Sequence, residues 1–133
     1  MKQGRIFQDD HFEFSEFNGL LLEKLVVCED PDTYDIILVH IKVENQNWHR
    51  FFIDMGFGFW DNWGEQEIEY EETCNYVDYT EKFDLTSKII DKIECKTIEN
   101  NCQIVISFLD GENLILRAKD FKSSDSESEL VMG

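Results

Sequence analysis

Apolar and polar residues alternate along much of this chain, and this alternation predicts short β-strands. Residues 35–44 give the clearest case, because every second position is strongly apolar over the whole segment. The positions on the apolar face are Ile37, Val39, Ile41 and Val43, and the other face carries Leu38, His40, Lys42 and Glu44. We therefore expect a strand that buries one face.

A second strand is predicted directly after this one. Asn45, Gln46 and Asn47 form a turn signal, since asparagine tolerates the left-handed backbone that tight turns need. Residues 48–55 alternate again, with Phe51 and Ile53 predicted in the core. Both faces of this segment carry apolar groups, which indicates a central strand covered on both sides.

The rest of the chain continues in short segments separated by turns. Strands are predicted at residues 11–15, 20–28, 89–98, 102–109, 114–118 and 130–132, although a helix also fits residues 20–28. Residues 72–87 fit a short helix or a loop, and residues 120–129 read as a polar loop. The expected fold is one mainly β domain over residues 1–133, or α+β with one short helix. An antiparallel meander would form a sandwich or a rolled, barrel-like sheet.

Residues 48–64 hold all three tryptophans of the protein. Residues 55–64, which carry Gly56, Gly58 and Gly64, are predicted to be a long aromatic connection. Most aromatic rings in proteins are buried, but the number here exceeds what one strand face can bury. Trp60 and Trp63 are therefore the predicted exposed anchors for a partner.

An acidic ladder follows the aromatic segment, formed by Glu65, Glu67, Glu69 and Glu71. On a strand these carboxylates project to one side, roughly 6.6 Å apart. No Lys or Arg occurs across residues 51–81, whereas solvated surfaces usually mix both signs of charge. The ladder fits either a surface for a basic partner or an edge strand protected from aggregation by its charge.

The formal net charge of −17 on 133 residues limits the classes of partner. Such a charge repels nucleic acid and anionic membranes and attracts basic proteins. The first ten residues lack a signal-peptide pattern, and no apolar run is long enough to span a membrane. These features predict a cytoplasmic protein.

No motif for catalysis, cofactor binding or metal binding occurs in the sequence. His11, His40 and His49 lack ligand spacing, although His40 and His49 could be neighbours on paired strands. The four cysteines form no C-x-x-C pair, so we expect four buried or half-buried thiols. Cys95 and Cys102 flank a predicted hairpin, and a disulfide between them is the minor alternative.

In its size, acidity and β-rich character, the chain resembles the immunity proteins that bacteria make against their own toxin domains. The resemblance implies a non-enzymatic protein that neutralises a basic partner, often a nuclease, without a cofactor. The predicted partner-binding residues are Trp60, Asp61, Trp63, Glu65, Glu67, Glu69 and Glu71. The alternative is a β-barrel that binds a small ligand in an aromatic-lined pocket. The sequence leaves the oligomeric state open.

Overall fold

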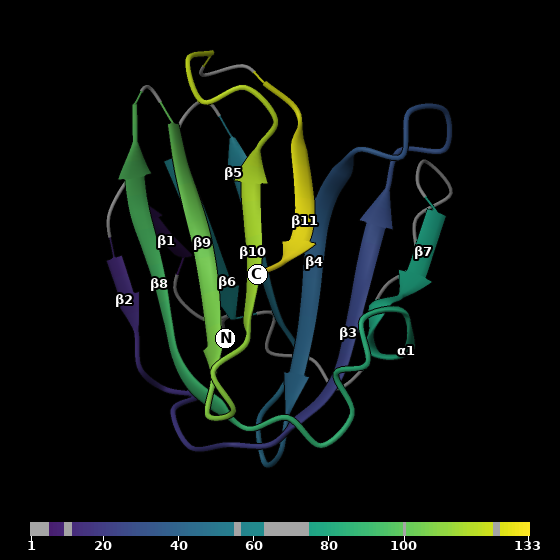
Figure 1. Cartoon of the computed structure of the whole chain (residues 1–133), viewed down its shortest axis with the longest axis vertical. Coiled ribbons are helices and arrows are strands. Elements are labelled where there is room, and N and C mark those ends of the chain that lie inside the picture. Colours follow the sequence, from purple (N-terminus) through teal and green to yellow (C-terminus); the bar gives the residue numbers. More distant parts are fainter. Residues whose placement is uncertain (1–5, 10–11, 55–56, 63–74, 100, 124–125) are drawn as a thin grey trace.

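The fold is mainly antiparallel β with one short helix, as the sequence predicts. The computed structural model describes residues 6–9, 12–54, 57–62, 75–99, 101–123 and 126–133 (Figure 1). The strands are β1 (Ile6–Asp9), β2 (Phe12–Phe14), β3 (Leu22–Glu29), β4 (Ile36–Val43), β5 (His49–Asp54), β6 (Phe57–Asn62), β7 (Asn75–Asp78), β8 (Ile90–Ile98), β9 (Asn101–Phe108), β10 (Asn113–Ala118) and β11 (Ser128–Met132), and the helix is α1 (Tyr79–Lys82).

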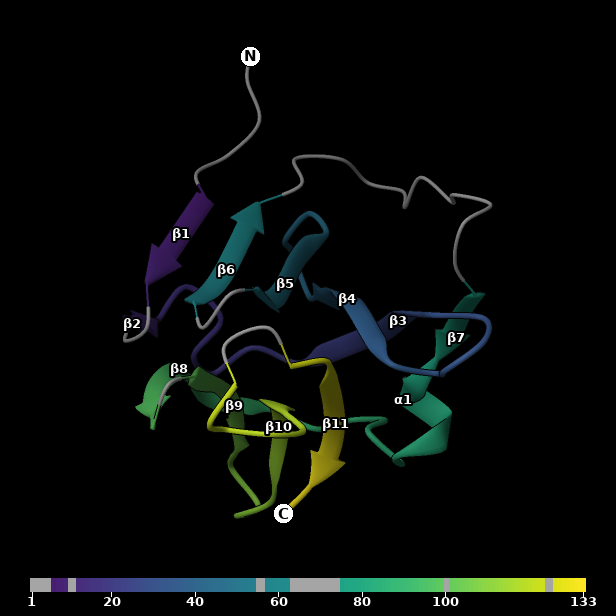
Figure 2. The same cartoon turned by 90° about the horizontal axis from the view of Figure 1, so that it is seen from above.

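The strands form two layers that face each other across the core. Seen from above, β1, β6, β5, β4, β3 and β7 make one layer and β8 to β11 make the other (Figure 2). We call them the β5 layer and the β9 layer. β2 extends the β9 layer by pairing with β8, and its Phe14 packs against Trp60 of β6. Among the described residues the two end strands, β1 and β2, do not pair with each other, so the sheet is not closed into a barrel.

The two layers are joined where β4 branches. β4 pairs with β3 on one side and with β5 on the other, and its first residue, Ile36, pairs with Ser128 of β11. The pairing of β3 with β4 shifts between Cys28 and Glu29, which leaves Ile37 as an extra residue on β4. A bulge of this kind bends a strand and re-aims its side chains.

The bulge explains one wrong prediction on this strand. Val39, Ile41 and Val43 are fully buried, as predicted, but Ile37 is 42% exposed. The extra residue shifts by one position the set of side chains that point toward the core, so strict alternation fails at Ile37.

The predicted aromatic connection at residues 55–64 is wrong for residues 57–62. These residues form β6, which pairs with β5 along its length and with β1 on its other side. Phe57 and Phe59 occupy one set of alternate positions, and Gly58 and Trp60 occupy the other. This period of two is typical of a strand and not of a connection. The glycines suggested a loop, but Gly58 simply faces Ile53 in the ladder.

The ambiguous residues 72–87 contain both an edge strand and a helix. β7 pairs with β3, and Asp78 then caps α1 by accepting a hydrogen bond from the Thr80 backbone at 2.9 Å. The Thr80 hydroxyl accepts from the backbone N–H of Leu25 at 2.8 Å, and the Tyr79 hydroxyl donates to the buried Glu29 carboxylate. These two bonds fasten the short helix to β3.

At the N-terminus, β1 was not predicted, whereas β2 and β11 lie where short strands were expected. Cys95 and Cys102 are buried and are not disulfide-bonded. They lie on paired strands, but Cys95 is opposite Ile104 and Cys102 is opposite Thr97, so the register offsets the two sulfurs. The prediction of four thiols is wrong at Cys28, which is disulfide-bonded.

Candidate functional site

Trp60, predicted as an exposed anchor, is completely buried. Its ring stacks between Phe14 and Phe51, with centroid distances of 4.1 and 5.0 Å. The indole Nε1–H donates a 2.9 Å hydrogen bond to Nδ1 of His49, which is also buried. The prediction is wrong because Trp60 faces inward on β6, where large rings from both layers fill the core.

The other predicted partner-binding residues are placed only in part. The backbone of Asp61 lies in β6, opposite Ile6 of β1 and Arg50 of β5. Trp63, Glu65, Glu67, Glu69 and Glu71 lie outside the described residues. The structure therefore removes Trp60 from the predicted surface and leaves the acidic ladder as a prediction.

A second group of aromatic residues covers the outer face of the β5 layer. Phe52 and Phe59 pair across β5 and β6 with a centroid distance of 4.6 Å, and both are half-buried. Trp48 lies in a small separate cluster with Val26 and Tyr76. β5 is thus a central strand between β4 and β6, as predicted, but the expected cover on both sides is not found among the described residues, because Phe52 and Phe59 on the outer face are only half-buried.

Most cations of the described surface are already paired with carboxylates. Two of these pairs are Lys42 with Glu23 at 3.2 Å and Arg117 with Glu129 at 2.9 Å. The cations paired in this way are Lys24, Lys42, Lys88, Lys92, Lys96, Arg117 and Lys119. Exposed ion pairs stabilise a fold only slightly, so their main effect is on the charge that the protein presents. The cations are held by the protein's own acids, and the excess of 17 negative charges remains.

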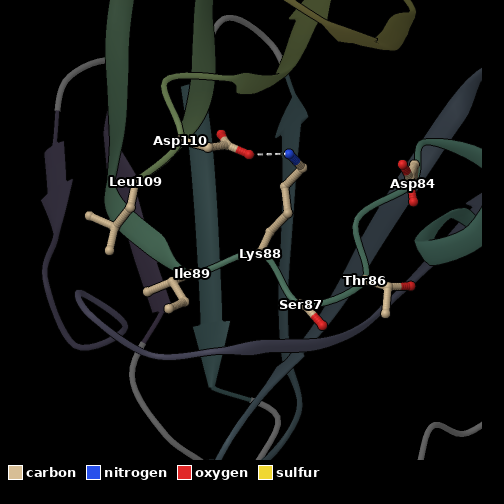
Figure 3. A pocket seen from close by; sticks show the side chains of 7 residues that line it. All are labelled: Asp84, Thr86, Ser87, Lys88, Ile89, Leu109 and Asp110. Carbon is tan, nitrogen blue, oxygen red and sulfur yellow. Dashed lines mark hydrogen bonds and ion pairs between the residues drawn. The ribbon is translucent and has the colours of Figure 1, made fainter.

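Exposed apolar side chains occur at positions that the sequence did not single out. Those with a large exposed fraction are Tyr34 (68%), Leu109 (61%), Phe57 (43%), Ile37 (42%) and Ile89 (38%). Tyr34 and Ile37 flank the start of β4, whereas Leu109 and Ile89 lie together at the opposite end of the molecule (Figures 1 and 3). Of these five residues, only Tyr34 has a left-handed backbone.

An open pocket of about 300 Å³ lies beside Leu109 and Ile89. Figure 3 shows Lys88 pointing toward Asp110, and Lys88 is also paired with Glu112. The hydrogen bond to Asp110 raises the pKa of Lys88, and the same bond lowers the pKa of Asp110. The central charge of the pocket is thus engaged within the protein, and the cluster ties the β9–β10 turn to the segment before β8.

The two described histidines lie on opposite faces of the β5 layer and are not neighbours. His49 faces the core, whereas His40 lies opposite Arg50 on the outer face. Burial, together with the nearby Arg50 charge, lowers the pKa of His40 from 6.5 to about 4. Among the described residues, no three His, Cys, Asp or Glu side chains form a group that could hold a metal ion.

No protein family, curated protein or solved structure matches this chain. In the described part of the chain, no helix has both the length and the apolar character required to cross a membrane.

Proposed function

We propose that this chain is a non-enzymatic protein-binding module that neutralises a basic partner protein, as an immunity protein neutralises a nuclease toxin. The observation that carries the proposal is the charge arrangement. The net charge is −17, and within the described residues seven lysines and arginines are in ion pairs with the protein's own carboxylates. Such a surface speeds association with a basic protein and disfavours nucleic acid.

The predicted contact residues are Asp61, Trp63 and the four glutamates of the acidic ladder. Trp60 is excluded because its ring is part of the core. A ligand site inside a closed barrel is not proposed, because the sheet is open and stacked rings fill the space next to Trp60.

The first test is retention of proteins from the source cell on the immobilised chain. We expect a basic protein to bind at low salt and to be released at moderate salt, since screening weakens charge attraction. Inhibition of that protein's activity by the soluble chain would complete the case. Failure to retain any basic protein at low salt would refute the proposed function.

The ladder is tested by reversing its charge. The double variant Glu67→Lys/Glu69→Lys should weaken binding of the retained protein by about tenfold at low salt, because two attractive charges become repulsive. The double variant Asp91→Lys/Glu99→Lys makes the same change in net charge on exposed residues of the β9 layer and serves as the control. Equal loss in both variants would mean that only net charge matters and would sink the site assignment.

A further inference from the structure

Tyr34 has a left-handed backbone, with φ of 63°, although it carries a large side chain. Glycine and asparagine adopt this conformation most easily, and other L-residues pay a conformational cost. Burial of the side chain could offset that cost, but Tyr34 is 68% exposed. The folded chain therefore carries a strained residue whose ring contributes little to the core. Strained positions of this kind cluster at binding sites.

The turn before β4 holds Tyr34 in a fixed position. The Asp30 carboxylate accepts hydrogen bonds from the backbone N–H groups of Asp32 and Thr33, at 2.8 and 3.1 Å. The Tyr34 backbone N–H donates to the Asp30 carbonyl at 2.9 Å, and the Asp30 N–H donates to the Asp35 carbonyl at the same distance. These bonds fix the backbone that carries the Tyr34 ring, so the turn itself has little freedom to lose on binding, which favours affinity.

The surroundings of Tyr34 combine apolar surface with negative charge. Ile37, the bulged residue of β4, is 42% exposed shortly after Tyr34. Asp32 is exposed, and neither it nor Asp30 is in an ion pair with a described residue. Asp35, by contrast, is paired with Lys119. An exposed aromatic ring next in the chain to carboxylates that have no ion pair with a described residue complements a recess that is apolar at its centre and basic at its rim.

We propose that Tyr34 is an anchor by which this protein docks onto its basic partner. The Tyr34 ring enters an apolar recess of the partner, Ile37 packs at the edge of that recess, and Asp30 and Asp32 face Lys or Arg side chains around it. This inference rests on the proposed function and assigns a contact surface to described residues, separate from the acidic ladder.

The test uses Tyr34→Asn and Tyr34→Gly in the full chain, with the basic protein that the wild type retains at low salt as the probe. Because asparagine and glycine suit the left-handed backbone, neither variant should lower Tm. Both should weaken binding of the probe by about tenfold. Leu109→Ala is the control, because it truncates an equally exposed side chain in the β9–β10 turn, at the other end of the molecule (Figure 1).

Each outcome decides the inference. A loss of binding in both Tyr34 variants, with Tm and the control unchanged, supports it. Unchanged binding in the Tyr34 variants overturns the anchor and leaves the proposed function standing. A fall in Tm also overturns the inference, since it would show that the ring serves the fold. If the wild type retains no basic protein, both proposals are refuted.

Discussion

At the scale of single residues, this protein buries polar groups in two different ways. In the core, His49 accepts a hydrogen bond from Trp60, so the Nδ1 lone pair must be free of a proton. On the outer face of the β5 layer, Nδ1 of His40 has no hydrogen-bond partner among the described residues. Both arrangements suit neutral imidazoles, and each has a measurable consequence.

Removing the indole N–H should destabilise the core without emptying it. Trp60→Phe keeps a ring between Phe14 and Phe51 but removes the donor to His49, which we expect to cost about 2 kcal/mol of unfolding free energy. Trp60→Ala also leaves a cavity and should cost about 3–5 kcal/mol. Urea denaturation measures both values. A cost near zero for Trp60→Phe would show that the hydrogen bond contributes nothing.

His40 should make the protein less stable in acid. Its pKa is about 4 in the folded state and 6.5 for a solvated histidine, so only the unfolded chain takes up a proton between these values. This contribution is fully present above pH 6.5 and is lost as the pH falls to about 4. The full loss is on the order of 3 kcal/mol. Urea midpoints of wild type and His40→Gln across this range should show a shallower slope in the variant. Parallel profiles would contradict the assignment to His40.

At the scale of elements, period-two alternation predicted most of the strands of the β9 layer and the inward face of β4. It failed where tertiary structure changes the local rule. The bulge at Ile37 is not visible in the sequence because it depends on the register between β3 and β4, which shifts between Cys28 and Glu29. The predicted exposure of Trp60 is wrong because the glycines near it favour a loop over a strand. Glycine in a strand and glycine in a connection look alike until the partner strand is known.

The helix α1 is too short to be stable alone and depends on its bonds to β3. Tyr79→Phe removes the donor to Glu29, which is only 7% exposed, and leaves a buried carboxylate without that partner. We expect a loss of about 1–3 kcal/mol in unfolding free energy. Lys82→Met is the control, because it removes an exposed ammonium that lies 3.3 Å from the same hydroxyl and 4.5 Å from the Tyr79 ring centroid but keeps the donor to Glu29. A loss in the control as large as that in Tyr79→Phe would contradict this account.

At the scale of the whole molecule, the net charge follows directly from the sequence, but the surface that contacts a partner does not. The net charge of −17 acts at long range, and no strand pattern says which carboxylates face a partner. Exposed Tyr34 could not be found from the sequence, because its left-handed backbone depends on how the turn closes.

Added salt should make the fold more stable, because it screens the repulsion between the protein's like charges. The Debye length falls from about 30 Å at 0.01 M to about 8 Å at 0.15 M, which screens the excess of like charges over long distances. The surface ion pairs weaken at the same time, but each contributes little. We expect Tm to rise between these two NaCl concentrations, in thermal scans followed by circular dichroism. A fall in Tm would mean that the ion pairs outweigh the repulsion.

The branch point at β4 also bears on how the protein is made. Ile36 of β4 pairs with Ser128 of β11, so the seam between the layers joins an early strand to a very late one. On the ribosome, β3, β4 and β5 can pair as soon as they emerge, but β4 must wait for its third neighbour until β11 has been translated. Until then, the nascent chain carries an open strand edge, and an open edge is the kind of surface that chaperones and other chains bind.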